Sequence, residues 1–319
     1  MEVPWHRRRR SLEHRRVVVV GASSGIGRAT ACALAGHRCR LVLAARADAD
    51  LADVSAACRA AGAGSVATLA VDIGTPDGVE ALAAFARAEL GTVDAWVNLA
   101  AGLLAGDLVA SPVADIERLL ATNVLGETLL SRAALEIFDA QGAGTLVNVS
   151  SLLGVVPNPL VPVYCASKFA ISGLTRSLQY TRRPRSIAIC LVEPGPVDTP
   201  IFANAGNHSG RRLRAIPPAI SPWRAAAAVV ACIRRPRRTT TTGATGWALL
   251  IGHRLAPRLA EWGVARYSAA LVVTPEPAAP TGGTLFESAS TGAVTGAYRR
   301  SSVRRRVGDH VGRRLLARP

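Results

Sequence analysis

The sequence predicts an α/β fold in which helices cover both faces of a doubly wound parallel sheet. Short continuous apolar runs, such as 17–20 and 40–45, are typical of strands buried on both faces. These runs alternate with longer segments of helical character, as expected for parallel strands joined by helices. Hydrophobic residues make up 49% of the 319 residues and aromatic residues only 4%. We therefore expect one large domain with an aliphatic core, together with appendages.

Before Pro200, strands are predicted at 17–20, 40–45, 65–71, 93–99, 145–149 and 187–192. The segments between them are predicted as helices at 27–35, 50–61, 75–90, 115–138 and 163–180. Pro76 stands near the start of the third helix, where its missing N–H costs no hydrogen bond. After Pro200 the alternation weakens, and we predict a loop at 203–222, a helix at 224–233, a weak strand at 239–242 and an apolar helical stretch at 247–272.

The net charge of +16 belongs to the ends of the chain. Residues 1–16 carry +4 and residues 201–319 carry +15, whereas residues 17–200 carry −3. Lys168 is the only lysine among 38 basic residues, which together with abundant alanine indicates GC-rich coding rather than selection for phosphate binding. We therefore expect no nucleic-acid partner and keep weak association with an anionic membrane as an alternative.

Cysteine usage and hydropathy predict a cytoplasmic protein, with a membrane-peripheral location as the alternative. The six cysteines form no C-x-x-C pair, so we expect neither a metal site nor a disulfide framework. The apolar run at 17–20 is too short for a signal peptide. Charged residues and a proline interrupt the stretch 247–273, which argues against a membrane-spanning helix.

A glycine-rich turn follows the first predicted strand, with the spacing G-x-x-x-G-x-G at Gly21, Gly25 and Gly27. Glycine permits a tight turn and a close approach of the backbone to a pyrophosphate, and the following helix N-terminus offers free N–H groups. A glycine cluster alone also fits an ordinary turn between a strand and a helix. Its place directly after the first strand favours a dinucleotide site.

Tyr164 and Lys168 stand four residues apart in a predicted helix, so their side chains share one face. A nearby cation lowers the pKa of a phenol, which suits proton exchange with a substrate oxygen. The alternative is a solvated helix face, but the only lysine of the chain falls at this spacing. Ser151 follows the fifth strand, at the sheet edge where ligands bind. It is a candidate for holding a substrate oxygen, or alternatively a simple turn cap.

These residues together resemble the short-chain dehydrogenase/reductase family, in its branch with the G-x-x-x-G-x-G cofactor motif and the Y-x-x-x-K active site. The resemblance covers 17–202. It rests on Gly21-x-x-x-Gly25-Ile26-Gly27, Asp72, Val97-Asn98, Thr122-Asn123-Val124, Ser151 with Tyr164-x-x-x-Lys168, and Pro194-Gly195-Pro196-Val197-Asp198-Thr199. It implies a Rossmann-like fold and hydride transfer between NAD(P) and a small-molecule alcohol or carbonyl substrate.

The resemblance also implies a role for each matching residue. Tyr164 would be the general acid/base, and Lys168 would lower its pKa and bind the nicotinamide ribose. Ser151 would orient the substrate oxygen, and Asn123 would hold a water of the proton relay. The implied cofactor-binding residues are Gly21, Ser23, Ser24, Gly25, Ile26, Gly27, Arg46, Asp72, Asn98, Ala100, Tyr164, Lys168, Pro194, Gly195, Val197 and Thr199. No metal ligand is implied.

Two positions depart from the family pattern. Val20 replaces the threonine that usually precedes the first glycine, and Ala101 replaces a glycine near the cofactor. We expect weaker cofactor affinity at most, because the four catalytic positions are intact. Arg46 follows the second strand where an acidic residue would select NAD, so the sequence favours NADP. The alternative is that Arg46 is a solvated loop residue.

The resulting domain plan has four parts. A disordered basic leader is expected at 1–16, the catalytic domain at 17–250 with a substrate lid at 201–222, an apolar helical extension at 251–273 and a basic, disordered tail at 274–319. The apolar stretch 247–272 suits packing on the domain or on a second subunit, and we expect a homo-oligomer. Two alternative functions stay open: a membrane-peripheral reductase of lipophilic, steroid- or retinoid-like substrates, and a cofactor-binding protein without catalysis.

Overall fold

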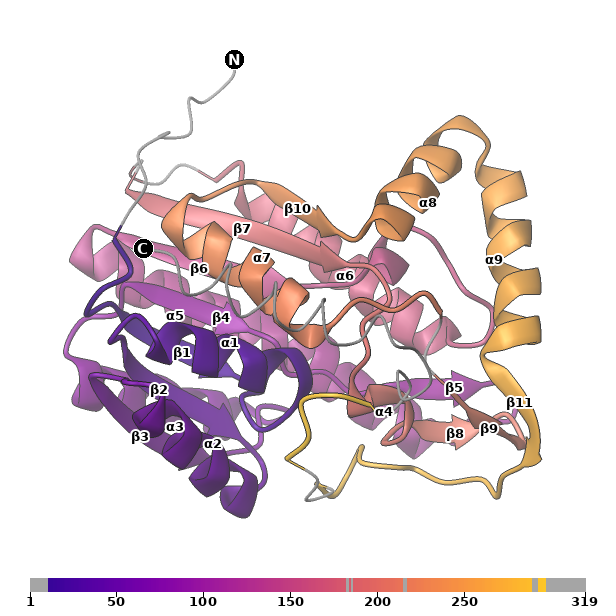
Figure 1. Cartoon of the computed structure of the whole chain (residues 1–319), viewed down its shortest axis with the longest axis horizontal. Coiled ribbons are helices and arrows are strands. Elements are labelled where there is room, and N and C mark those ends of the chain that lie inside the picture. Colours follow the sequence, from indigo (N-terminus) through magenta and orange to yellow (C-terminus); the bar gives the residue numbers. More distant parts are fainter. Residues whose placement is uncertain (1–10, 182–183, 185, 215–216, 289–291, 297–319) are drawn as a thin grey trace.

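The computed structural model describes residues 11–181, 184, 186–214, 217–288 and 292–296. A parallel sheet in the order β10-β7-β6-β4-β1-β2-β3 forms its centre (Figure 1). Its strands are β1 (Arg16–Val20), β2 (Arg40–Ala45), β3 (Ser65–Ala70), β4 (Ala95–Asn98), β6 (Gly144–Val149), β7 (Ile187–Pro194) and β10 (Thr239–Thr242). The predicted doubly wound fold is confirmed, including the weak strand at 239–242.

Helices cover both faces of this sheet (Figure 1). One face carries α1 (Gly25–Ala35), α2 (Asp48–Ala60) and α7 (Pro222–Arg234). The other carries α3 (Pro76–Leu90), α5 (Glu127–Gln141) and α6 (Pro162–Leu178). Alternate residues of β1 point to opposite faces, with Val17 and Val19 packed on the first layer and Val18 on the second. Burial on both faces explains why the strands are continuous apolar runs in the sequence.

The strand order reverses between β1 and β4, which are neighbours in the sheet. The chain winds outward from β1 to β3 and then returns to the other side of β1. Loops that leave the carboxyl ends of β1 and β4 therefore diverge and leave a crevice between them. This topology places the glycine-rich turn at the position where an open α/β sheet binds ligands.

The predicted long helix at 115–138 is divided in the structure. It consists of α4 (Val113–Leu120), a π-helical turn, η1 (Ala121–Gly126), and α5. π-turns of this kind are frequent at functional sites, and Asn123 lies within this one. The sequence periodicity did not reveal the turn, because its apolar positions continue through it.

The apolar stretch predicted at 247–272 forms a hairpin of two helices, α8 (Ala244–Leu255) and α9 (Pro257–Leu271). The chain breaks at Ala256, which has φ −144° and ψ 72°. A residue before proline avoids the helical region, and Pro257 has no N–H for the preceding helix. The predicted boundary between residues 250 and 251 therefore falls inside α8. The hairpin stands beside the carboxyl end of the sheet (Figure 1).

The predicted N-terminal leader extends too far into the chain, and the predicted C-terminal tail begins too early. Leu12 is only 3% exposed, and the guanidinium groups of Arg15 and Arg16 bind Asp94 at 3.0 and 2.9 Å, so residues 11–16 belong to the fold. At the other end, β11 (Val273–Pro277) pairs with β9 (Arg211–Leu213). Residues 278–288 and 292–296 continue across the domain. The expected disorder at 1–10 and 297–319 lies outside the described residues.

The loop predicted at 203–222 contains short strands. These are β8 (Gly206–His208), which pairs with β5 (Leu104–Gly106), and β9. Two 3-10 turns, η2 (Leu152–Gly154) and η3 (Pro200–Phe202), lie at the carboxyl ends of β6 and β7. None of the described helices combines the length and hydropathy needed to cross a bilayer.

Candidate functional site

A groove opens between the glycine-rich turn and the loop after β4, and it is lined by Gly21, Ser23, Ser24, Gly25, Ile26 and Gly27 from the turn. Gly21 has φ +84°, and a Cβ there would lie 2.6 Å from the amide nitrogen of Ala100. A Cβ on Gly27 would lie 1.9 Å from the carbonyl oxygen of Gly21. Only glycine fits at both positions, so the turn brings bare backbone and the N-terminus of α1 to the groove. Val20, Ala100 and Ala101 also line it.

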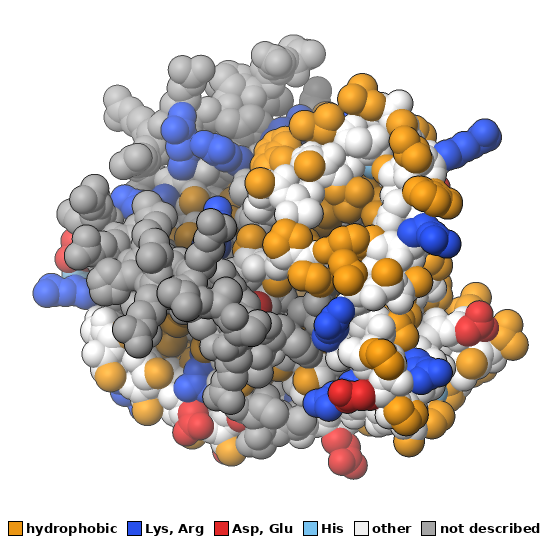
Figure 2. All heavy atoms as spheres, turned by 45° about the vertical axis from the view of Figure 1, so that its right-hand side comes forward, with side chains coloured by type: hydrophobic (Ala, Val, Ile, Leu, Met, Phe, Trp, Pro, Cys, Tyr) orange, Lys and Arg blue, Asp and Glu red, His pale blue; other side chains and the backbone are white. Residues whose placement is uncertain are grey.

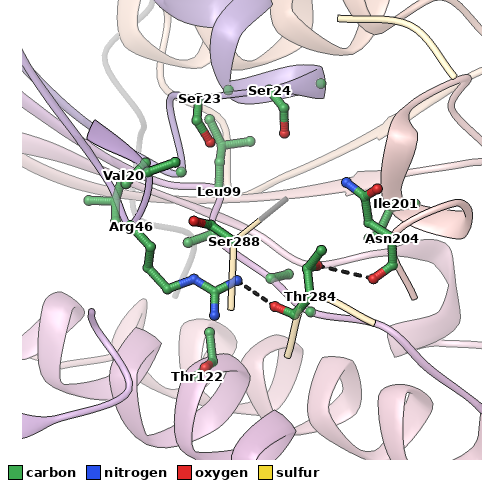
Figure 3. Close-up of a pocket in the computed structure, with 18 of the residues that line it drawn as sticks. Val20, Ser23, Ser24, Arg46, Leu99, Thr122, Ile201, Asn204, Thr284 and Ser288 are labelled. Carbon is green, nitrogen blue, oxygen red and sulfur yellow. Dashed lines mark hydrogen bonds between the residues drawn. The ribbon is translucent and has the colours of Figure 1, made fainter. Parts of the chain in front are cut away.

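The guanidinium group of Arg46 lies in the groove (Figure 3), and Asp72 also lines it. Arg118 on α4 donates to Asp72 at 2.5 Å, and the N–H of Gly74 donates to the same side chain at 2.8 Å. Burial raises the pKa of Asp72, but these hydrogen bonds and the nearby guanidinium charges outweigh it and hold the pKa below its ordinary value. Burial and the charge of Arg118 lower the pKa of Arg46. Both predicted residues, Arg46 and Asp72, therefore lie in the groove.

Asn98, a predicted cofactor contact, lies behind the groove, as Lys168 lies behind the adjoining cavity. The Asn98 side chain is 1% exposed and does not line the groove. Its Nδ2 donates to Oδ1 of Asn148 at 2.9 Å, and its Oδ1 accepts from Nε1 of Trp96 at 2.9 Å. Adjacent strands β4 and β6 bring the two asparagines together, since they are register partners. The side chain of Asn98 thus satisfies a buried polar network, and its predicted cofactor contact stays a prediction.

A second cavity of about 500 Å³ adjoins the groove and contains two of the four predicted catalytic residues. Ser151, directly after β6, and Tyr164, in the first turns of α6, both line it. The two side chains share a hydrogen bond. Of the predicted cofactor contacts, Pro194, Gly195 and Val197 line this cavity, and Thr199 lines both it and the groove. A ligand that lies along the groove therefore reaches the tyrosine and the serine.

Lys168 and Asn123 lie behind the cavity wall, and both are buried. The Nζ of Lys168 donates to the carbonyl of Val149 at 3.1 Å and lies 6.0 Å from the centre of the Tyr164 ring. The side chain of Asn123 clasps the backbone of Gly102, accepting from its N–H at 2.8 Å and donating to its carbonyl at 3.0 Å. It also donates to Ser167 at 3.1 Å. The π-turn and α6 are thus tied to the loop after β4.

Glu127 is an ionisable partner of Lys168 that the sequence reasoning missed. Its Oε2 lies 3.7 Å from Nζ of Lys168, both side chains are at most 3% exposed, and Oε1 accepts no hydrogen bond from any described residue. Burial raises the pKa of Glu127 to about 7, although the charge of Lys168 opposes the shift. The sequence could have indicated this residue, because Glu127 follows Asn123 by one helical turn and therefore lies on the same face.

The pKa of Tyr164 differs in direction from the expectation. Burial raises it above its ordinary value, and the charge of Glu127 raises it further, whereas the hydrogen bond with Ser151 lowers it. Lys168 was expected to lower this pKa, but its closest charged neighbour is Glu127 rather than the phenol. The neutral phenol is therefore the dominant form of Tyr164 near neutral pH, ready to donate a proton.

The cavity is apolar, and the α8–α9 hairpin forms part of its wall. Its apolar lining comes from the segment after β6, the turn η3 and the hairpin, as Leu152, Leu153, Leu160, Val161, Ile201, Phe202, Ala248, Leu249, Val264 and Val272. The predicted lid at 201–222 contributes Ile201, Phe202 and Pro217. The hairpin, which includes most of the extension predicted at 251–273, contributes more lining residues than the predicted lid. Within the described residues, no cluster of side chains suits a metal ion.

Comparison with known proteins agrees with this geometry. The family profile described as short chain dehydrogenase matches residues 15–210. The uncharacterized oxidoreductase YxnA of Bacillus subtilis is 30% identical over 256 residues, which are 79% of this chain and 72% of that protein. The cis-4-hydroxycyclohexanecarboxylate dehydrogenase of Sinomonas cyclohexanicum is 37% identical over 58% of this chain and 74% of its own length. The crystal structure of a short chain dehydrogenase/reductase from Burkholderia phymatum in complex with NAD superposes with a TM-score of 0.71 at 26% identity, covering 78% of this chain and 96% of that one.

Proposed function

Because the chain belongs to the short-chain dehydrogenase family, it is a nicotinamide-dependent oxidoreductase, and we propose that it interconverts an alcohol and a carbonyl on a bulky apolar substrate with NADP. The observation that carries this proposal is the pairing of Tyr164 and Ser151 at the wall of an apolar cavity that adjoins a glycine-lined groove. One site thus combines a proton donor, space for an apolar substrate and a groove for a dinucleotide.

The groove fits a dinucleotide on the evidence of its backbone. Its glycines leave no room for a Cβ, Ser23 and Ser24 place hydroxyl groups along it, and α1 begins there. The turn would hold the pyrophosphate, and residues 194–199 would lie along the nicotinamide. When bound, the nicotinamide supplies or accepts the hydride.

The chain's own residues would manage the substrate oxygen. In the reducing direction, the hydroxyl of Ser151 donates a hydrogen bond to the carbonyl oxygen and fixes its position. Tyr164 donates its proton as negative charge develops on that oxygen, and Lys168 stabilises the resulting phenolate. Asn123 keeps the π-turn in place, and its backbone would hold the water of a relay that returns the proton. In the oxidising direction the same proton moves back to Tyr164.

Arg46 supports the preference for NADP. Its guanidinium group lies in the groove at the end of β2, beside Asp72 and Arg118, where the ribose of an adenosine would lie. A guanidinium pairs with a phosphate through charge-assisted, bidentate hydrogen bonds. The acidic side chain that would select NAD is absent from this position.

The test is a cofactor-oxidation screen over ketones, aldehydes, steroids and quinones, followed by Tyr164→Phe on any substrate found. Loss of the phenol hydroxyl removes the proton donor, so turnover should fall by about 10²–10⁴ while cofactor affinity changes little. Ser172→Ala, on the same helix but directed at Glu193 and Ser150, is the matched control and should retain turnover. Near-normal turnover of Tyr164→Phe would refute the mechanism.

A membrane-peripheral reductase of lipophilic substrates is a second candidate, favoured by the outer face of the α8–α9 hairpin. Trp247, Ile251, Leu255, Leu259 and Trp262 are between 51% and 81% exposed there. Figure 2 shows hydrophobic side chains gathered over this part of the molecule with basic side chains around them. Arg254 and Arg258 flank the break between the helices. Apolar and basic side chains on one face suit an anionic bilayer surface.

A further inference from the structure

The segment after β11 returns to the candidate cofactor groove and lies along it. We name residues 281–288 and 292–296 the C-terminal strap. The backbones of Thr281 and Asn207 exchange two hydrogen bonds, at 2.7 and 3.1 Å. Both the N–H and the hydroxyl of Thr284 donate to the carbonyl of Asn204, at 2.9 and 3.0 Å. Leu285 is 4% exposed and packs with Leu104, Leu119 and Val163. The strap is therefore docked by backbone pairing and by one buried anchor.

Two glycines of the strap permit this close approach. Gly283 has φ +54°, and a Cβ there would lie 2.3 Å from the carbonyl oxygen of Ala205. Gly292 has φ +48°, and a Cβ there would lie 2.8 Å from Nη1 of Arg28. An L-residue would be strained at either position; at Gly283 it would also clash with backbone, and at Gly292 it would displace the end of the Arg28 side chain. Glycine at these two positions therefore allows the strap to dock there, where most other residues would not fit.

The docked strap directs carbonyl oxygens at the cationic end of the groove. Arg46 donates to the carbonyls of Thr284, Leu285 and Phe286, at 2.5, 2.8 and 3.3 Å (Figure 3). Arg118 also donates to the carbonyl of Leu285, at 2.8 Å. The guanidinium nitrogens of Arg46 that face this end of the groove are therefore engaged by neutral peptide oxygens.

Residues 292–296 of the strap direct their carbonyl oxygens at the glycine-rich turn. The N–H of Gly25 donates to the carbonyl of Ala293 at 3.0 Å, and Arg28 donates to the carbonyl of Gly292 at 2.6 Å. At the end of this segment, the N–H of Gly296 donates to the carbonyl of Asp198 at 3.3 Å. Peptide oxygens thus meet donors at both places where the proposed function puts the phosphates of NADP.

From this coincidence we propose that the C-terminal strap is a built-in competitor of the dinucleotide: it must leave the glycine-rich turn before either cofactor binds, and it must also leave Arg46 before the 2′-phosphate of NADPH binds. The inference rests on the proposed function, since it concerns the same groove. A phosphate forms stronger, charge-assisted hydrogen bonds with guanidinium than a neutral carbonyl does, so the cofactor displaces the strap and gains Arg46 as a partner. The cofactor affinity observed is then the intrinsic affinity reduced by the fraction of molecules with an open strap.

The consequence for selectivity is specific. NADPH, which carries the extra 2′-phosphate, competes for all the donors that the strap holds, whereas NADH competes only for those at the glycine-rich turn. Release of the strap should tighten the binding of both cofactors, and that of NADPH more. A strap that instead formed a wall of the cofactor site would have the opposite effect, because its removal would cost contacts with the ligand.

The experiment compares Gly283→Ala with Gly142→Ala in the full chain. Gly142 also has a positive φ, +78°, but nothing lies within 4 Å of a Cβ there, so it controls for backbone strain without displacing the strap. Dissociation constants for NADPH and NADH are measured by cofactor fluorescence. If the strap is open about a tenth of the time, Gly283→Ala should bind NADPH about tenfold more tightly, and Gly142→Ala should bind like the parent chain. Unchanged or weaker binding by Gly283→Ala would overturn the proposal.

A second measurement needs no variant. Hydrogen exchange of the parent chain is followed with and without saturating NADPH, and the amides of Thr284 and Leu285, which are hydrogen-bonded in the docked strap, are compared. A competitor predicts faster exchange with ligand, and slower or unchanged exchange overturns the proposal. Both readouts report binding, so a chain that turns over no alcohol or carbonyl yet shows these effects refutes only the proposed reaction. If neither cofactor binds either glycine variant, the strap proposal and the proposed cofactor both fail.

Discussion

The Nζ of Lys168 is buried beside two oxygen atoms. The carbonyl of Val149 accepts a hydrogen bond, and the carboxylate of Glu127 lies within ion-pair distance. A buried charge without such partners would cost several kcal/mol. The pair also determines how much of the lysine's charge acts on Tyr164, because an ionised Glu127 cancels part of it. At the residue scale, we therefore expect the charge of Glu127 to adjust the pKa of Tyr164.

Glu127→Gln tests this control through the pH dependence of alcohol oxidation, which needs the phenolate. Besides burial, the charge of Glu127 raises the pKa of Tyr164, so its removal should lower that pKa and move the rising limb of the kcat/KM profile to lower pH. The pKa of Glu127 is about 7, and below that pH the parent chain has also lost the charge. The two profiles should therefore diverge above about pH 7 and converge below it. Glu193→Gln, at a buried acid paired with Arg176, is the control, and superimposable profiles for Glu127→Gln would contradict the assignment.

Arg46→Asp tests the choice of cofactor. Charge reversal removes an attraction and adds a repulsion, so a swing of a few kcal/mol is expected, given about 1.5–3 kcal/mol for each charged hydrogen bond. The parent chain should bind NADPH more tightly than NADH, and the variant should reverse the order. Dissociation constants from fluorescence titration provide the measurement. Equal affinities in the parent chain that persist in Arg46→Asp would show that this side chain does not contact the ribose.

At the element scale, the α8–α9 hairpin serves the cavity and the surface together. Its inner face contributes Ala248, Leu249 and Val264 to the cavity, whereas its outer face exposes Leu255 and Trp262. A helix that is apolar on both sides needs a second apolar environment for its outer face. The bend at Pro257 makes this arrangement possible, since a straight helix of the same length would present one face along its whole length.

The double variant Leu255→Ser/Trp262→Ser tests a bilayer as that environment. Burial of each side chain is worth about 1.5–3 kcal/mol, so the pair should reduce co-sedimentation with phosphatidylserine vesicles by at least tenfold. Val109→Ser is the matched control, because Val109 is 94% exposed on a different part of the molecule. If the parent chain does not sediment with these vesicles and instead associates with itself through the hairpin, the outer face is a subunit interface and not a membrane surface.

At the scale of the whole molecule, charge and catalysis are separated along the chain. Residues 1–10 carry +3 and residues 297–319 carry +7, whereas the residues that build the sheet up to Pro200 carry a small negative charge. Removal of both segments at once should leave the thermal unfolding temperature and NADPH affinity nearly unchanged. Salt-sensitive retention on an anionic resin should fall strongly, since long-range attraction depends on net charge and is screened by salt. A collapse of NADPH affinity would show that these ends belong to the cofactor site.

The sequence by itself determined the parts of this protein that depend on local pattern. Apolar runs separated by helical segments specified the parallel sheet, because a strand buried on both faces must be apolar throughout. The glycine spacing predicted a tight turn after the first strand, because no other residue has room at Gly21 and Gly27. The spacing of Tyr164 and Lys168 follows from the helical repeat, so the structure had to bring them to one face.

Only the tertiary structure decided which distant residues meet. The pairing of Glu127 with Lys168 and that of Asn98 with Asn148 depend on strand order and helix packing, which spacing along the chain does not encode. The same holds for the strap, whose carbonyls reach Arg46 across 238 to 240 residues of sequence. Every residue has the same backbone carbonyl, so no pattern of side chains predicts which carbonyls will accept a hydrogen bond from Arg46. Local sequence therefore specified the elements and the spacing of Tyr164 and Lys168, and three-dimensional packing specified the residues that contact them.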